Sequence, residues 1–176
     1  MLTVFTIGHS THEPGTFAEL LAQHDVRTLV DVRRYPGSRR VSWTNAGEIE
    51  RALPAVEYRH LPGLGGRRRP DRDSVNGFWE NNAFRGYADH MASDEFATAL
   101  ESLLELARQR TVAVMCAEGP WWRCHRRLLA DALVGGGFDV CHIDRRGRAE
   151  PHRLTEGAVV EGTRVRYPPA QEQLGL

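Results

Sequence analysis

The chain has 176 residues, which suffices for one domain that buries about two-thirds of its unfolded surface without disulfides. Its three cysteines are too few for a secreted disulfide framework, which predicts a cytoplasmic protein in a reducing compartment. The 23 basic and 23 acidic residues cancel, whereas a dedicated DNA-binding domain usually has a basic excess. No apolar run approaches about 18 residues and no signal-peptide pattern opens the chain, so we expect neither a membrane span nor a membrane partner.

The N-terminal third of the chain alternates strand and helix patterns. β-Branched runs indicate strands, and apolar residues at helical spacing indicate helices. The expected elements are a strand at 3–8, a helix at 13–24, a buried strand at 27–32, a short helix at 45–53 and a short strand at 56–61. A basic, turn-rich loop, residues 33–40, follows the second strand.

The rest of the chain continues this alternation after one irregular segment. Residues 62 to about 82 are glycine-rich and basic, which favours a functional loop or lid over a disordered connector. The expected elements that follow are a helix at 94–110 with Asp94 as N-cap, a buried strand at 111–116, a helix at 124–133 ended by three glycines, and a strand at 138–143. Beyond residue 145 the chain is polar, with an edge strand expected at 163–167.

This order predicts a single-domain, three-layer α/β fold, with a mostly parallel sheet flanked by helices on both faces. Residues 1–145 would form the domain and 146–176 a C-terminal extension. Ligands of parallel sheets bind beyond the carboxyl ends of the strands. Segments 8–12, 31–33 and 116–126 leave strands at that edge, so we expect them to converge.

Arginine is the only basic residue besides histidine, and its distribution is uneven. Fifteen arginines fall in four clusters, at 33, 34, 39 and 40, at 67, 68, 69 and 72, at 123, 126 and 127, and at 145, 146, 148 and 153. The planar guanidinium matches phosphate and carboxylate groups. The clusters therefore favour an anionic small molecule or nucleotide as ligand, and nucleic acid remains an alternative.

Cys116 and Cys124 lie between a buried strand and a helix start, where the helix dipole and nearby arginines lower a thiol pKa. Cys124 is a candidate nucleophile, resolving thiol or metal ligand. Cys116 is either a nucleophile or a buried strand-end residue, and Cys141 is expected in the core. Glu118 and Asp31 are the best general acid or base candidates, although Asp31 may serve only to anchor an arginine.

Aromatic side chains accompany the arginines. Trp121 and Trp122 adjoin Arg123, a combination that can stack bases while it holds phosphates. A tryptophan pair in a glycine-proline turn should be partly exposed. Ser10, after the first strand, is expected to cap the following helix, and His9 stands beside it at the same strand end.

Five segments of the chain closely resemble one protein family. They are IGHST (7–11), VDVRRYPGSRR (30–40), YRHLPGLGG (58–66), NNAFRGYADHM (81–91) and MCAEGPWWRCHRRLLADAL (115–133). The family is known as domain of unknown function 488 (DUF488), and the resemblance extends from about residue 3 to residue 145. It implies the fold and these motif residues: His9, Ser10, Asp31, Arg33, Pro36, Ser38, Arg39, Leu64, Gly65, Gly66, Phe84, Arg85, Gly86, Tyr87, Cys116, Glu118, Arg123, Cys124, His125 and Arg126.

Residues 29–33 and 114–123 are similar, more weakly, to the rhodanese-like pattern, in which a strand-end cysteine carries a persulfide. This similarity implies Cys116 as the nucleophile and Arg123 as part of an anion cradle. Pro120 and two tryptophans inside the loop depart from that pattern.

Three interpretations of the site stay open. The leading one is a thiol-dependent transferase or hydrolase, with catalytic residues among Cys116, Cys124, Glu118, His125 and Asp31 and an anionic substrate bound by His9, Ser10, Arg33, Arg39, Arg85, Tyr87, Trp121, Trp122, Arg123 and Arg126. The second is a nucleic-acid or nucleotide binding module with structural cysteines. The third is a metal-binding protein with His9, Glu118, Cys124 and His125 as ligands. No other cofactor is indicated, and the oligomeric state is open.

Overall fold

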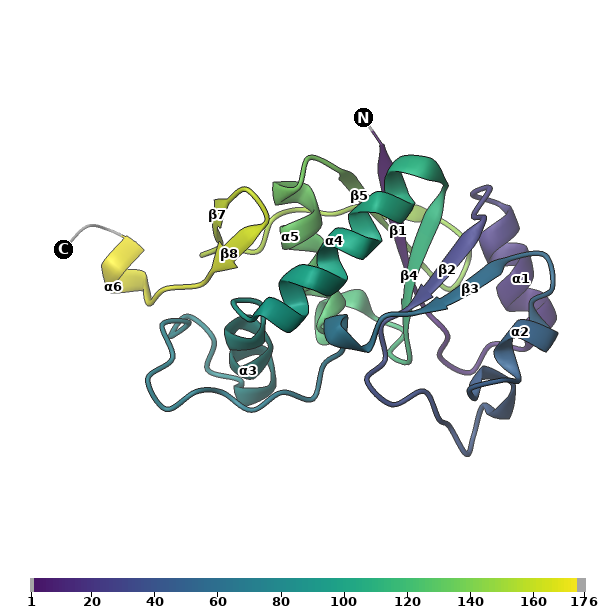
Figure 1. The fold of residues 1–176 in the computed structure, drawn as a ribbon, viewed down its shortest axis with the longest axis horizontal. Coiled ribbons are helices and arrows are strands. Elements are labelled where there is room, and N and C mark those ends of the chain that lie inside the picture. Colours follow the sequence, from purple (N-terminus) through teal and green to yellow (C-terminus); the bar gives the residue numbers. More distant parts are fainter. Residues whose placement is uncertain (1, 174–176) are drawn as a thin grey trace.

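A six-stranded sheet forms the centre of the protein in a computed structural model that describes residues 2–173 (Figure 1). The strand order is β3-β2-β4-β1-β5-β6, and all neighbours are parallel except β5 and β6. The strands are β1 (Thr3–Gly8), β2 (Thr28–Asp31), β3 (Glu57–His60), β4 (Val112–Cys116), β5 (Asp139–Ile143) and β6 (Ala149–Pro151). The expected mostly parallel sheet is therefore confirmed.

Helices cover both faces of this sheet, as the alternation of elements predicts. The helices are α1 (Pro14–Ala22), α2 (Ile49–Ala52), α3 (Asn82–His90), α4 (Asp94–Gln109), α5 (Arg126–Gly135) and α6 (Ala170–Gln173), with single 3-10 turns η1 (Ser42–Thr44), η2 (Pro62–Leu64) and η3 (Trp121–Arg123). Figure 1 shows α1 and α2 on one side of the sheet and α4 and α5 on the other.

Two apolar clusters match these two layers. One includes Phe17 and Leu21 of α1 and packs on Met115 of β4, and the other includes Leu103 of α4 and Leu128 of α5. Because β4 is buried along its whole length, its apolar run Val112–Cys116 contributes to both clusters. Among the described residues, no helix is both long and apolar enough to cross a membrane.

Several local expectations are corrected. The helix expected at 45–53 is reduced to α2, and α4 is capped by Ser93, whose hydroxyl accepts from the Phe96 amide, rather than by Asp94. The helix expected from residue 124 begins at Arg126, which leaves Cys124 just before its first turn. Residues 82–90, which follow the expected irregular loop and for which no element was expected, form α3.

The C-terminal part also differs from the expected edge strand at 163–167. Strand β8 (Arg164–Arg166) pairs with β7 (Val159–Glu161) in a separate two-stranded sheet. The edge of the main sheet is instead β6, which is antiparallel to β5. A short hairpin needs only a local turn, whereas adding a strand to the main sheet edge would need a pairing across a longer connection.

The strand register determines where the functional segments meet. Gly8 pairs with Cys116, and Asp31 pairs with Met115, so β1, β2 and β4 end at the same level. The segments that follow these strands accordingly lie at one edge of the sheet, as expected for a parallel fold.

Candidate active site

Two thiols meet at the carboxyl end of β4. Cys116 is the last residue of this strand, and Cys124 immediately precedes the first turn of α5. Their sulfur atoms lie 2.8 Å apart, although both are free cysteines. The side chains are buried, with 2% of Cys116 and 5% of Cys124 exposed. The seven-residue loop between them thus brings Cys124 back into contact with Cys116.

The surroundings of the two sulfur atoms shift the pKa values of the two thiols in opposite directions. Burial opposes ionisation of Cys124, but the hydrogen bond from the Cys116 thiol, the His125 imidazole and the Arg126 guanidinium together hold its pKa well below the usual value. The Arg126 backbone N–H at the helix start also donates to this sulfur, at 3.5 Å. Burial and the adjacent Cys124 raise the pKa of Cys116. The two environments therefore favour the thiolate form of Cys124 and the thiol form of Cys116.

His125 lies beside the thiolate. Its Nδ1 atom is 3.5 Å from the Cys124 sulfur, and its ring packs on Tyr87 with centroids 5.0 Å apart. On another side the backbone of Gly66 approaches so closely that a Cβ there would lie 2.8 Å from Nδ1. Packing from two sides fixes this imidazole next to the sulfur, as a general acid or base requires.

Arg126 shapes the loop rather than the ligand cavity. Its guanidinium is buried and donates to the Glu118 and Gly119 carbonyls at 2.5 and 3.0 Å. It also donates to the Thr6 hydroxyl at 3.4 Å. The expected anion-binding role of Arg126 is thus replaced by one in which it holds the loop and supplies positive charge beneath the thiol pair.

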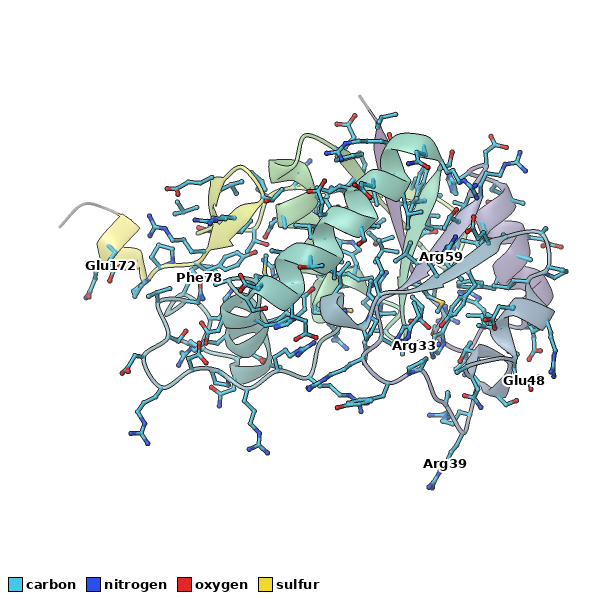
Figure 2. The ribbon with its side chains drawn as sticks, in the orientation of Figure 1. Arg33, Arg39, Glu48, Arg59, Phe78 and Glu172 are labelled. Atoms are coloured by element: carbon cyan, nitrogen blue, oxygen red, sulfur yellow. The ribbon has the colours of Figure 1, made fainter. Side chains whose placement is uncertain are left out.

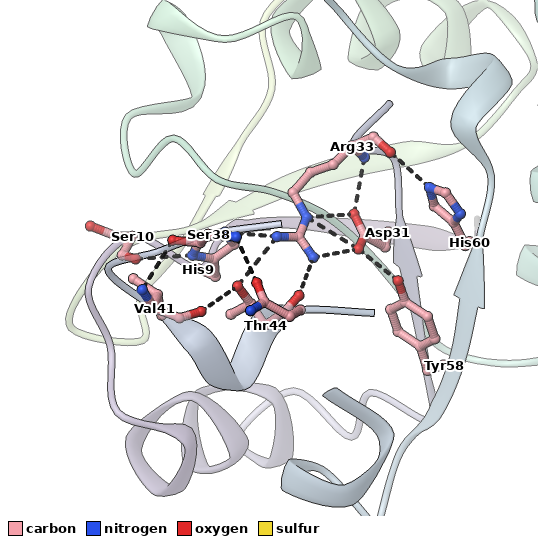
Figure 3. A network of polar contacts seen from close by, with 10 residues as sticks. His9, Ser10, Asp31, Arg33, Ser38, Val41, Thr44, Tyr58 and His60 are labelled. Atoms are coloured by element: carbon pink, nitrogen blue, oxygen red, sulfur yellow. Dashed lines mark hydrogen bonds and ion pairs between the residues drawn. The ribbon is translucent and has the colours of Figure 1, made fainter. Parts of the chain in front are cut away.

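Asp31 and Arg33 form a buried ion pair at the end of β2 (Figure 3). Arg33 donates from Nη2 and Nε to the two carboxylate oxygens at 2.7 and 2.9 Å, and the Tyr58 hydroxyl donates to the carboxylate at 2.8 Å. A further Nη2 bond reaches the Thr44 carbonyl at 2.6 Å. Since both carboxylate oxygens are occupied, the geometry favours Asp31 as an anchor for Arg33 rather than as a general acid or base.

His9 completes this network from the end of β1. Its Nδ1 donates to the Ser10 carbonyl at 2.9 Å, which leaves Nε2 to accept from Arg33 Nη1 at 3.3 Å. Burial, together with the charge of Arg33, lowers the pKa of His9, which is consistent with a neutral ring. His9 therefore supports Arg33 from the side opposite to Asp31.

A cavity of about 430 Å³ opens above the thiols and this network. Its walls include Cys116, Cys124, His125, Glu118 and four arginines, namely Arg33, Arg34, Arg67 and Arg123. Arg34 and Arg67 were not singled out as site residues from the sequence, although both stand in the arginine clusters. Arg67 has φ of 59°, and its carbonyl accepts from Arg34 Nη1 at 3.1 Å, so the loop 62–82 folds over the cavity beside the 33–40 loop.

Several residues expected to bind substrate lie elsewhere. Arg39 is exposed, and Figure 2 shows it at a loop tip, pointing away from the domain. Arg85 donates from Nε to the Trp79 carbonyl at 2.8 Å, and the buried Tyr87 donates to the Leu64 carbonyl at 2.8 Å. None of these three side chains lines the cavity. They belong to loop structure and core packing.

Ser10 and the tryptophans also have other roles than expected. Ser10 has φ of 45°, and its amide donates to the Ala117 carbonyl at 3.1 Å, while the helix cap is Glu13 without a side-chain bond. Trp122 is 52% exposed, as expected for one of the pair. Trp121 is also partly exposed, as expected, but its ring stacks on His142, with centroids 4.0 Å apart and planes within 6°. Cys141, expected in the core, is only partly buried.

A buried chain of polar groups behind Arg126 was missed from the sequence. His152 Nε2 donates to Asp131 at 2.8 Å, so its Nδ1 accepts from His142 Nε2 at 2.9 Å. His142 Nδ1 then accepts from the Thr6 hydroxyl at 2.6 Å. Burial first, and then the neighbouring His152, lower the pKa of His142 to about 3. This chain of hydrogen bonds runs from Arg126 to Asp131, and only the long-range contacts reveal it.

The four candidate metal ligands line one cavity but are not arranged as a metal-binding group in the described part of the chain. Within residues 2–173, no group of three or more His, Cys, Asp or Glu side chains is placed to hold a metal ion. His9 is engaged with Arg33, and Glu118 is an exposed residue of the cavity wall. The structure thus supplies no geometric support for the metal interpretation.

The fold and this site define an α/β protein with a paired thiol in an arginine-lined cavity at the carboxyl edge of a parallel sheet. Residues 14–133 match the model of the family described as Domain of unknown function DUF488, and because this is more than half of the chain, the protein belongs to that family. The matched residues include Asp31, Arg33, Cys116 and Cys124, but the match begins after His9. No curated protein and no solved structure matches the chain. The rhodanese-like similarity stays a prediction.

Proposed function

We propose that this protein is a thiol-dependent enzyme in which the Cys124 thiolate attacks a small anionic substrate. The observation that carries the proposal is the 2.8 Å contact between two free thiols in the wall of a cavity lined by four arginines. The thiolate is the nucleophilic form of cysteine, and the contact with Cys116 helps to keep Cys124 in that form.

The cavity sets the class of substrate. Its volume of about 430 Å³ suits a small molecule or a nucleotide, since ligand sites generally span about 300–1,000 Å³. Arg34, Arg67 and Arg123 would bind phosphate or carboxylate groups, whereas the Arg33 donors are already engaged by Asp31, His9 and Thr44. Trp121 is stacked on His142, and neither Trp121 nor Trp122 lines the cavity, which favours a small anionic ligand over a nucleic-acid strand. Free thiols also fit a cytoplasmic location, where cysteines stay reduced.

Glu118 and His125 are the proton-transfer groups of this proposal. Both line the cavity beside the thiols, and neither is held in an ion pair in the described part of the chain. Because Cys124 reacts as a thiolate, His125, which is in contact with it, would pass a proton to the leaving group, and Glu118 would exchange protons with His125 or solvent.

Alkylation by an anionic and a neutral reagent tests the proposal. Relative to a free thiol, Cys124 should favour iodoacetate over iodoacetamide by about tenfold, the effect of one charge-assisted hydrogen bond. Arg123→Gln should weaken that preference, and Arg39→Gln, an exposed arginine outside the cavity, serves as its matched control. A wild-type preference equal to that of the free thiol, or an equal effect of both substitutions, would contradict the proposal.

A further inference from the structure

We infer that Cys116 and Cys124 act together as a redox-active dithiol that reduces an anionic disulfide and closes into an intramolecular disulfide. This inference rests on the proposed function and names its reaction and substrate class. It assigns both thiols of the pair to one two-electron step. Nucleophilic attack by Cys124 needs no second thiol. The proposed function therefore leaves the position of Cys116, in contact with Cys124, without a chemical role.

The geometry carries the inference. A disulfide bond is about 2.05 Å long, so the two sulfur atoms, 2.8 Å apart, need to move together by less than an ångström. No other residue separates them, because each contacts the other directly. The loop between them is held from below by Arg126, which donates to the Glu118 and Gly119 carbonyls. The fold thus keeps residues eight apart in sequence poised for bond formation.

The two thiols suit different steps. Cys124 lines the cavity at the helix start, where the Arg126 amide and His125 stabilise its negative charge, so it is the attacking group. Cys116 ends a buried strand and stays protonated until its partner has reacted. A thiol in contact with the attacking sulfur is placed to attack the mixed disulfide once it has lost its proton.

The reaction balances with the substrate as oxidant. The Cys124 thiolate attacks one sulfur of R–S–S–R′, forms a Cys124–S–S–R mixed disulfide and releases R′S⁻. Cys116 gives its proton to R′S⁻, directly or through His125, and attacks the Cys124 sulfur, which releases RS⁻. The products are R′SH, RS⁻ and the Cys116–Cys124 disulfide, so the substrate gains the two electrons that the dithiol loses. An external thiol restores the dithiol by the reverse exchange.

The substrate disulfide should carry negative charge near its sulfur atoms. Arg34, Arg67 and Arg123 line the same cavity as the thiols, whereas the charge of Arg33 is paired with Asp31. A carboxylate-bearing disulfide would therefore be oriented for attack, whereas a cationic one would be repelled.

Oxidation by two small disulfides of opposite charge tests the inference. The reduced protein, in a Cys141→Ser background, is treated with glutathione disulfide or cystamine and followed by intact-protein mass spectrometry. We expect glutathione disulfide to produce the loss of two hydrogen atoms, with an added glutathionyl group only as a transient, and to react about tenfold faster than cystamine after normalisation to a free dithiol. Dithiothreitol should reverse the change.

Single-thiol variants assign the roles. Cys116→Ser should accumulate the mixed disulfide on Cys124. Cys124→Ser, which retains only Cys116, should form a mixed disulfide much more slowly than Cys116→Ser does. Circular dichroism and the melting midpoint of each variant report folding, and Cys116→Ala and Cys124→Ala provide a second replacement at each position. A stable glutathionyl adduct in the wild-type background, with no internal disulfide, would overturn the inference.

The outcomes separate this inference from the proposed function. If Cys124 prefers iodoacetate and this preference depends on Arg123, but the internal disulfide does not form, only the dithiol chemistry fails. If the internal disulfide forms at equal normalised rates with both reagents, the dithiol stands and anionic selectivity is refuted. If neither occurs, both proposals are wrong.

Discussion

Replacement of Asp31 by asparagine is expected to lower the free energy of unfolding by about 3–5 kcal/mol, because it leaves a buried guanidinium without its counter-charge. Arg33 is 8% exposed and Asp31 is fully buried, so water cannot compensate. The amide of asparagine keeps the shape of the carboxylate but not its charge. Urea unfolding, with the midpoint and slope compared to those of the wild type, measures the loss.

An exposed ion pair is the control for this substitution. Glu48→Gln breaks the ion pair between Glu48, 55% exposed, and Arg51, 78% exposed. It should change the free energy of unfolding by no more than about 0.5 kcal/mol. If Asp31→Asn lowers the free energy of unfolding by as little as the control does, the Asp31–Arg33 ion pair does not stabilise this edge of the sheet.

Gly8→Ala is the second substitution with a large expected effect. A Cβ at this position would lie 1.8 Å from the Glu118 carbonyl oxygen and 2.8 Å from the Gly119 Cα, both backbone atoms. The strand end and the loop would have to separate, which should lower the free energy of unfolding by about 2–3 kcal/mol. Because Arg126 bonds the same carbonyl, the loop displacement should also slow alkylation of Cys124.

Gly15→Ala provides the matched control. Gly15 lies in α1, and a Cβ there would meet no atom within 4 Å. Removing a glycine from a helix should raise stability by about 0.5–1 kcal/mol. Thermal unfolding of both variants compares them, and a Gly8→Ala protein as stable as the wild type would contradict the close approach of β1 to the loop.

The five parallel strands of the main sheet were predictable because each has its own sequence pattern, whereas the antiparallel strand β6 was not expected. The run at 111–116 is apolar throughout, which only a strand buried on both faces explains, and β4 occupies the centre of the order. Helix α3 was missed because it contains Gly86. This glycine lowers helix propensity, but a Cβ there would lie 2.2 Å from the Arg68 carbonyl, so packing against the loop requires it.

The site was predictable in location and less so in detail. That β1, β2 and β4 would place Cys116 and Arg33 at one edge follows from parallel pairing alone. The contact between the thiols depends on how the seven-residue loop folds over Arg126, a long-range interaction without a sequence pattern. Likewise, Arg34 and Arg39 belong to one cluster, but local turn geometry directs only Arg34 into the cavity.

The acidity of Cys124 is the central claim, since both proposed reactions begin with its thiolate. Ultraviolet absorbance of the thiolate, titrated in wild-type protein and in Cys124→Ser, measures it most directly. Because the pKa of Cys124 is depressed, wild-type protein should hold one thiolate at pH values far below about 8.5, the pKa of a free cysteine, and Cys124→Ser should lose it. A wild-type protein in which every thiol ionises at or above about pH 8.5 would contradict the account.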